Sequence, residues 1–372
     1  MELTRYHVRL KNVRSPDFAP LFHKPGPAVR KLLLSLATLL LLAGCSGLAV
    51  LNSMTTDSGY AVATNIPYDR DTGMSLDMYN FRGSRDAPVV VFLYGGRWTE
   101  GSKDDYKFIG QALTSQGFIT VIPDYRKYPK VRFPTFVQDA AKAVKWTHDN
   151  IQRYGGDPRK IFIMGHSSGA HMAAMLALNE EYLKAVGGSR SWLRGMIGLA
   201  GPYDFLPLTA PDLRDLFGPP DRYELSQPIL FTDGQNPPLL LLHAEDDQTV
   251  LVKNTRNLAR AVAKAGGPVE TLIYPKVGCP ALNSHYCIVA TIAAPLRRQS
   301  DVLDGVTDFI RRRSGMTPLR APAKAPAQQI DSYDPQSPDN QPLPDPQPLQ
   351  IETEPQGQPQ PVPVPAPAPA NP

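Results

Sequence analysis

The stretch Gly165-His166-Ser167-Ser168-Gly169 places a serine between two glycines, directly after the apolar run Ile161–Met164. The apolar run predicts a buried strand, and Ser168–Leu178, rich in alanine and methionine, predicts a helix. A tight strand-to-helix turn leaves no room for side chains two positions either side of its central residue, which explains the glycines. Such a turn holds the Ser167 hydroxyl clear of the sheet at a helix N-terminus, where a developing anion is favoured. The glycine spacing therefore selects Ser167 over Ser168 as a nucleophile.

A nucleophilic serine needs a base to remove its proton and an acid to orient that base. After a turn of this kind the chain order is serine, acid, histidine. Of the seven histidines, His243 and His285 lie beyond the predicted helix. His243 closes the apolar run Leu239–Leu242, which favours a structural residue at a strand end, so His285 is the predicted base. The acidic run Glu245–Asp247 follows that strand, where the acid of the triad belongs.

A glycine pair follows another apolar run, Ala87–Tyr94, in Tyr94-Gly95-Gly96-Arg97-Trp98. Paired glycines leave backbone N–H groups unobstructed, so this loop is predicted to help bind the oxyanion of an acyl-transfer reaction. Removing one such donor typically lowers the rate about 10²–10³-fold. The alternative is an ordinary Gly-Gly turn.

Strands and helices alternate through the middle of the chain. Strand-like apolar runs show no alternation, which indicates burial on both faces and a mostly parallel sheet. They are Ala87–Tyr94, Phe118–Pro123, Ile161–Met164, Gly195–Leu199, Pro238–Leu242 and Val269–Tyr274. Helical spacing covers Phe133–Tyr154, Ser168–Leu178, Val252–Ala265 and Val302–Arg313. The pattern predicts one doubly wound α/β domain over residues 59–315, with an antiparallel start in Gly59–Asn80. Asp204–Leu230 is expected to form a lid or pocket wall.

The N-terminal segment has the composition of an export signal. Arg30-Lys31 precedes the eleven-residue apolar run Leu32–Leu42, which is shorter than the about 20 residues of a membrane span. Leu42-Ala43-Gly44-Cys45 resembles the lipobox of bacterial lipoproteins, which implies a signal over 1–44, a lipidated Cys45 and an anchor linker over 45–58. A start at Val29 would give a signal of ordinary length. Ser46 after the cysteine favours the periplasmic face of the outer membrane, with the inner membrane as the alternative.

The C-terminal segment, residues 316–372, differs in composition from the domain. From Thr317 onward it holds 17 of the chain's 39 prolines. Such a tail buries too little apolar surface to offset ordering, so it is predicted to be disordered, with a role as spacer or as a proline-rich ligand for a partner. The net charge of +4 gives no nucleic-acid signature.

The cysteines indicate a possible disulfide. With Cys45 acylated, Cys279 and Cys287 remain, and an even pair in an oxidising compartment favours a bridge, although two free thiols are the alternative. Because the two cysteines bracket His285, a bridge would hold the base in position. No Cys/His cluster has metal-ligand spacing, and neither a metal nor an organic cofactor is expected.

Several stretches together resemble the α/β-hydrolase superfamily, and most closely the carboxylesterases related to hormone-sensitive lipase and to isoprenylcysteine methylesterase. They are Y-G-G-R-W, P-D-Y-R-K-Y-P, Y-G-G-D-P-R-K-I-F-I-M-G-H-S-S-G-A-H, L-L-H-A-E-D-D-Q-T-V and A-P-L-R-R-Q-S-D-V-L-D-G-V-T-D-F-I, spread over residues 60–313. The resemblance implies the nucleophile Ser167, the acid Asp247 rather than Asp246, and the base His285. It also implies oxyanion donors at the backbone N–H groups of Gly96, Arg97 and Ser168.

The sequence departs from this family in two places. Tyr94 stands where the family usually has histidine, and the loop before His285 is longer than usual. The expected function is a lipid-anchored serine hydrolase that cleaves small carboxylic esters through an acyl-enzyme. The alternatives are an arylformamidase-like amide hydrolase and a non-catalytic envelope scaffold of the same fold.

Overall fold

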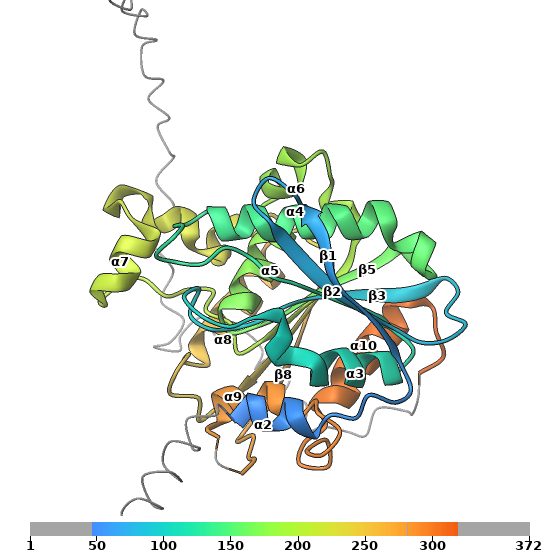
Figure 1. The fold of residues 1–372 in the computed structure, drawn as a ribbon. Coiled ribbons are helices and arrows are strands. Elements are labelled where there is room, and N and C mark those ends of the chain that lie inside the picture. The colour runs from blue at the N-terminus through green and yellow to red at the C-terminus, as the bar shows by residue number, and fades with distance from the viewer. Residues whose placement is uncertain (1–46, 281, 319–372) are drawn as a thin grey trace, which may run out of the picture. The chain divides into compact units, whose positions relative to one another are not determined.

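One mixed sheet forms the centre of the part of the chain that the structure describes (Figure 1). The structure is a computed structural model that describes residues 47–280 and 282–318; the predicted signal, Cys45 and nearly all of the predicted tail lie outside these ranges. The strands follow the order β1-β2-β4-β3-β5-β6-β7-β8 across the sheet. They are β1 (Ala61–Asp69), β2 (Met74–Asn80), β3 (Ala87–Leu93), β4 (Ile119–Pro123), β5 (Gly156–His166), β6 (Leu193–Leu199), β7 (Leu239–Ala244) and β8 (Val269–Tyr274).

Helices cover both faces of this sheet. The α-helices are α2 (Gly47–Met54), α3 (Lys107–Ser115), α4 (Thr135–Asn150), α5 (Ser168–Leu178), α6 (Glu181–Ala185), α7 (Pro211–Phe217), α8 (Lys253–Lys264), α9 (Ser284–Ala290) and α10 (Val302–Ser314). The short 3-10 helices are η1 (Lys103–Tyr106), η2 (Ile151–Tyr154), η3 (Arg190–Trp192), η4 (Pro220–Ser226) and η5 (Pro228–Phe231). Helices α4 and α5 lie on one face, and α3 and α10 lie on the other (Figure 1).

The strand pairing confirms the predicted fold class. β3 pairs with β4 and β5, and β5 to β8 continue, all in parallel. β1 pairs antiparallel with β2, and β2 with β4, as expected for the start of the domain. Every residue of β3 and β4 is buried, because strands covered on both faces must be apolar throughout. This is the doubly wound sheet of the α/β-hydrolase fold.

Three segments differ from the sequence prediction. β5 begins at Gly156, earlier than expected, because the helix before it ends at Asn150 and η2 leads into a left-handed Gly155 with φ of 84°. Residues 47–54, expected to be linker, form α2, whose Leu48 and Leu51 are buried. The segment carrying His285, expected to be a loop, contains the short helix α9.

Candidate active site

Ser167 lies in the turn between β5 and α5, at the carboxyl edge of the parallel strands. Its backbone has φ of 53° and ψ of −123°, a strained conformation for a residue with a side chain. A Cβ built on Gly165 would collide with the backbone of Gly169, and one built on Gly169 would collide with the carbonyl oxygen of Leu93. Both glycines are therefore required sterically, which is why the chain can place the serine in this turn.

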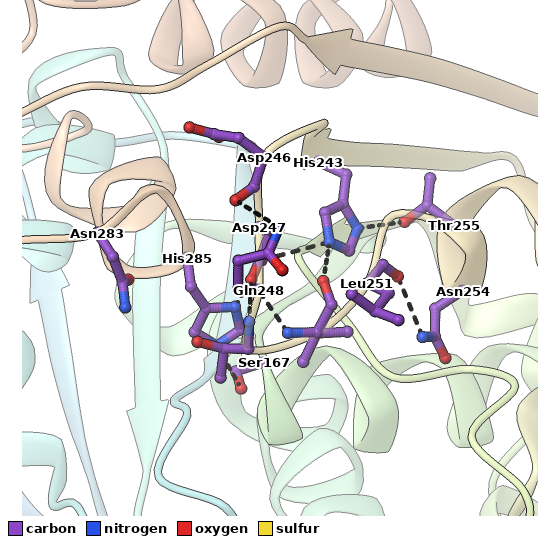
Figure 2. A network of polar contacts seen from close by, with 12 residues as sticks. Ser167, His243, Asp246, Asp247, Gln248, Leu251, Asn254, Thr255, Asn283 and His285 are labelled. Carbon is purple, nitrogen blue, oxygen red and sulfur yellow. Dashed lines mark hydrogen bonds and ion pairs between the residues drawn. The ribbon is translucent and has the colours of Figure 1, made fainter.

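His285 and Asp247 meet Ser167 at this edge (Figure 2). His285 Nε2 lies 2.9 Å from Ser167 Oγ, and His285 Nδ1 lies 2.7 Å from Asp247 Oδ2. Since an ionised carboxylate can only accept, Nδ1 carries the proton and donates it to Asp247. Nε2 is then free to accept the hydrogen of the Ser167 hydroxyl. Three side chains from distant parts of the chain thus form a continuous proton path.

Asp247 is buried, whereas its neighbour Asp246 is exposed. Asp247 Oδ1 accepts hydrogen bonds from the backbone N–H groups of Thr249 and Val250, at 2.8 and 3.0 Å. Burial by itself would raise the pKa of Asp247, but hydrogen bonds from His243 and His285 outweigh it and hold the pKa below its usual range. The carboxylate is therefore ionised and fixed in position facing His285.

His243 contacts the acid of the site, which its position at a strand end in the sequence did not indicate. Its side chain is fully buried, and Nε2 lies 2.7 Å from the Val250 carbonyl and 3.3 Å from Asp247 Oδ2. Because a carbonyl only accepts, Nε2 carries the proton, and Nδ1 accepts from the Thr255 hydroxyl at 2.8 Å. His243 thus supports the loop that presents Asp247, a role that its sequence position alone did not reveal.

His166 is a second histidine whose role the sequence did not indicate. It precedes Ser167, and its Nε2–H donates to the backbone carbonyl of His285 at 2.8 Å. Burial lowers the pKa of His166 to about 3, so the ring is neutral. The residue beside the serine therefore holds the backbone of the base, and only the folded arrangement brings the two together.

A disulfide joins Cys279 and Cys287 across the segment that carries His285. His285 occupies the first turn of α9, where the Asn283 side chain accepts the Tyr286 backbone N–H at the helix N-terminus. The sequence prediction of a long loop missed this helix, because seven residues are too few for a periodic signal. The bridge, the cap and His166 together fix the segment that carries His285.

The glycine loop after β3 passes beside Ser167. A Cβ built on Gly95 would lie 3.1 Å from Ser167 Cβ, so only glycine allows this approach. Gly96, Arg97 and Trp98 all have positive φ, and the turn closes where the backbone N–H groups of Thr99 and Glu100 donate to the Gly96 carbonyl. Tyr94, found where the family has histidine, supports the loop by donating from its hydroxyl to Asp124 Oδ1 at 2.8 Å.

The segment expected to form a lid or pocket wall contacts this loop. Asp212, near the start of α7, pairs with the Arg97 guanidinium at 2.8 Å, and both side chains are about half exposed. Phe217, at the end of α7, packs edge-on against the buried Trp98 with ring centroids 4.9 Å apart. Residues 204–230 thus wall the glycine loop on its outer side.

The comparisons with known proteins define the class. The BD-FAE family profile matches residues 76–262, half of the chain, so the chain belongs to the BD-FAE family of α/β-hydrolase esterases. The matched range contains Ser167 and Asp247 and ends before His285. The predicted resemblance to this superfamily is confirmed.

Among the curated proteins to which the chain is similar are two that carry the name of an esterase. The chain is 28% identical over 239 residues to the isoprenylcysteine alpha-carbonyl methylesterase of Arabidopsis thaliana, covering 57% of this chain and 55% of that protein. It is 29% identical over 242 residues to esterase LipQ of Mycobacterium tuberculosis, covering 61% and 55%. The chain thus spans about half the length of the curated relatives it matches.

Solved structures share the fold. A truncated carbohydrate esterase from gut microbiota superposes with a TM-score of 0.58 at 22% identity, covering 70% of this chain and 99% of that one. A thermostable carboxylesterase from a metagenomic library gives a TM-score of 0.59 at 20% identity, covering 72% and 94%. Within residues 47–280 and 282–318, no helix is long and apolar enough to cross a membrane.

Proposed function

We propose that this protein is a serine carboxylesterase. Ser167 Oγ attacks the ester carbonyl carbon while His285 Nε2 takes the hydroxyl proton. The backbone N–H groups of Gly96, Arg97 and Ser168 stabilise the tetrahedral oxyanion. The alcohol leaves with the proton from His285, and an acyl group remains on Ser167. Water, deprotonated by His285, then releases the carboxylic acid and restores the serine.

The observation that supports this proposal most strongly is the continuous path from Ser167 through His285 to Asp247. Its two distances, 2.9 and 2.7 Å, lie within hydrogen-bond reach, and each proton has a defined donor and acceptor. Membership of an esterase family, and relatives named as esterases, support ester rather than other acyl substrates.

Turnover of matched acyl substrates tests the reaction. We expect short-chain p-nitrophenyl esters to be hydrolysed well above the rate of formyl anilides. The reverse preference would replace the esterase proposal with an amide hydrolase.

Covalent labelling tests the nucleophile. A fluorophosphonate probe should label the wild-type protein and fail to label Ser167→Ala. Ser168→Ala is the matched control: it removes a neighbouring hydroxyl but keeps the backbone N–H, so labelling should persist. A wild-type protein that takes no label would be a scaffold with a hydrolase fold.

We further propose that the chain is an exported lipoprotein held through Cys45, at the periplasmic face of the outer membrane. The lipobox-like Leu42–Cys45 after a basic and apolar lead supports this. Cys45→Ser should move the protein from the membrane to the soluble fraction, and intact mass should show a lipid on Cys45 of the wild type. The proline-rich segment 316–372 then serves as a spacer or partner ligand.

A further inference from the structure

The first residues that the structure describes after Cys45 form a packed helix, α2. The structure describes α2 from Gly47, which follows Cys45 by two positions in the sequence. Leu48 and Leu51 are buried on one side of α2, while Val50 and Met54 on the other side are 48% and 57% exposed. A packed helix is therefore present from the second residue after the proposed anchor.

Asn52 links α2 by hydrogen bonds to η1 and α3, the helices that follow the glycine loop. Its Nδ2 donates to the Asp104 carbonyl at 2.6 Å, and its Oδ1 accepts the Phe108 backbone N–H at 3.3 Å. Tyr106, the residue at the N-terminus of α3, provides no side-chain cap, so Asn52 supplies the acceptor from another part of the chain. Lys107 and Asp57 add an ion pair at 2.6 Å just beyond α2.

The first residue of α2 contacts the segment that carries the base. A Cβ built on Gly47 would lie 2.6 Å from Leu282 Cδ2, and Leu282 lies between the two bridged cysteines. In Figure 1, α2 and α9 lie side by side, as the contact of Gly47 with Leu282 requires. Two Cα steps, at most about 7 Å, join Gly47 to Cys45, so a lipid on Cys45 would tether the chain beside the segment that carries the base.

We propose that the lipid on Cys45 holds the active site against the bilayer, and that the substrate is an ester carried by a lipid at the membrane surface. This inference rests on the proposed lipid anchor. A packed helix one residue from the anchor fixes orientation as well as distance, whereas a flexible linker would fix only distance. The exposed Val50 and Met54, with Tyr286 of α9 at 38% exposure, present apolar and aromatic side chains suited to the interface.

Site-specific labelling of the full lipidated chain in vesicles of phosphatidylethanolamine and phosphatidylglycerol tests the orientation. Cys279 and Cys287 are bridged and Cys45 carries the lipid, so the Val50→Cys variant takes one fluorophore, at position 50. Arg159→Cys is the matched control, since Arg159 lies in the first half of β5, away from Ser167, and its side chain is 84% exposed. We expect spin-labelled lipids to quench the fluorophore at 50 several-fold more than the one at 159. Equal quenching, or stronger quenching at 159, overturns the orientation.

A flexible Gly-Ser segment of about 20 residues between Ser46 and Gly47 tests the substrate class. Activity on a soluble short-chain ester should be unchanged, because the insertion precedes α2. Activity on a long-chain ester embedded in the vesicles should fall about tenfold. The flexible tether would no longer hold the active site at the membrane surface, so its effective concentration there would be lower. Equal activity on the embedded ester before and after insertion overturns the proposal.

The mass of the Cys45 peptide separates the possible failures. An unmodified Cys45 overturns the anchor and this inference together. A lipidated Cys45 with equal quenching overturns the orientation alone. A lipidated protein that hydrolyses neither ester overturns the esterase proposal itself.

Discussion

The turn that holds Ser167 and the segment that holds His285 reach the same 2.9 Å contact by different means. The Ser167 turn joins a strand buried at the centre of the sheet to a fully buried helix, and two glycines four positions apart fix its path. The His285 segment follows the edge strand β8, and is fixed by a disulfide, a helix cap and a hydrogen bond from His166. The nucleophile is positioned by the steric demands of two glycines, and the base by a covalent bridge, a helix cap and a hydrogen bond.

The largest effect should come from Gly169→Ala. The added Cβ would meet the backbone of Leu93 and Tyr94, which cannot move without displacing β3. We expect a loss of stability above about 4 kcal/mol and little soluble protein, measured by expression and thermal unfolding. Ala170→Gly, one position along α5, should cost about 2 kcal/mol, from helix propensity and the loss of one buried methyl group. A stable Gly169→Ala protein would show that the turn is not set by sterics.

Asp247→Asn should leave the fold intact and lower kcat about 10⁴-fold. The amide can donate to His285 Nδ1, which favours the tautomer whose Nε2–H cannot accept the serine proton. Steady-state kinetics on a p-nitrophenyl ester measure the loss. Asp246→Asn, at the exposed neighbouring carboxylate, is the control and should retain activity. Similar losses in both variants would mean that the acid has been assigned to the wrong residue.

Removing the disulfide should loosen the base and leave the nucleophile in place. The Cys279→Ala/Cys287→Ala variant should lose about 2–3 kcal/mol of unfolding free energy, from the short loop that the bridge closes. Activity should fall by up to about 10²-fold, since a base displaced by about 1 Å loses alignment. Fluorophosphonate labelling and urea unfolding follow the two effects. Reductant should lower the activity and the unfolding free energy of the wild type and leave those of the double variant unchanged. An equal response of both proteins would refute the role of the disulfide in positioning His285.

Acidification should destabilise both regions through buried neutral histidines. Burial lowers the pKa of His166 to about 3 and that of His171, in α5, to about 4, both below the unfolded value of about 6.5. The unfolded chain then binds more protons below pH 6.5, so stability present above that pH is lost as the pH falls towards the folded pKa. Between pH 7 and pH 5 each histidine should cost about 2 kcal/mol.

Urea unfolding of His171→Gln at the two pH values measures this contribution. Glutamine can still donate to the Ser226 carbonyl that His171 contacts at 2.8 Å, but it does not titrate. The loss between pH 7 and pH 5 should shrink by about 2 kcal/mol. An unchanged loss would mean that His171 is not buried in its neutral form.

The smallest predicted change in stability comes from α2, the helix whose first residue contacts the segment that carries His285. Asn52→Ala removes the acceptor for Phe108 N–H and the donor to Asp104, so unfolding free energy should fall by about 1 kcal/mol. Ser53→Ala, on the same helix with an exposed hydroxyl, is the control. Equal stability of the two variants would show that α2 is held by its leucines alone.

The Ser167 side of the site could be read from the sequence because its determinants are adjacent. The apolar run, the two glycines and the helix after them occupy one continuous stretch, and the predicted helix Ser168–Leu178 matches α5 residue for residue. The mostly parallel central sheet follows from the same alternation of strand and helix, whereas its strand order, with β3 between β4 and β5, does not. α2 and α9 were missed because helices of eight and seven residues carry too little periodicity to distinguish from loop.

The sequence by itself determined the fold class, the nucleophile and the candidate acid and base, because strand burial and turn sterics act between neighbouring residues. Tertiary structure alone decided that His166 holds the backbone of His285, that His243 supports the loop of Asp247, and that Asn52 caps a distant helix. These contacts join residues whose separation along the chain exceeds any local pattern, or whose partner is a backbone atom. Every residue type carries the same backbone carbonyl, so the sequence does not indicate which side chain donates a hydrogen bond to it. Only the folded structure shows this.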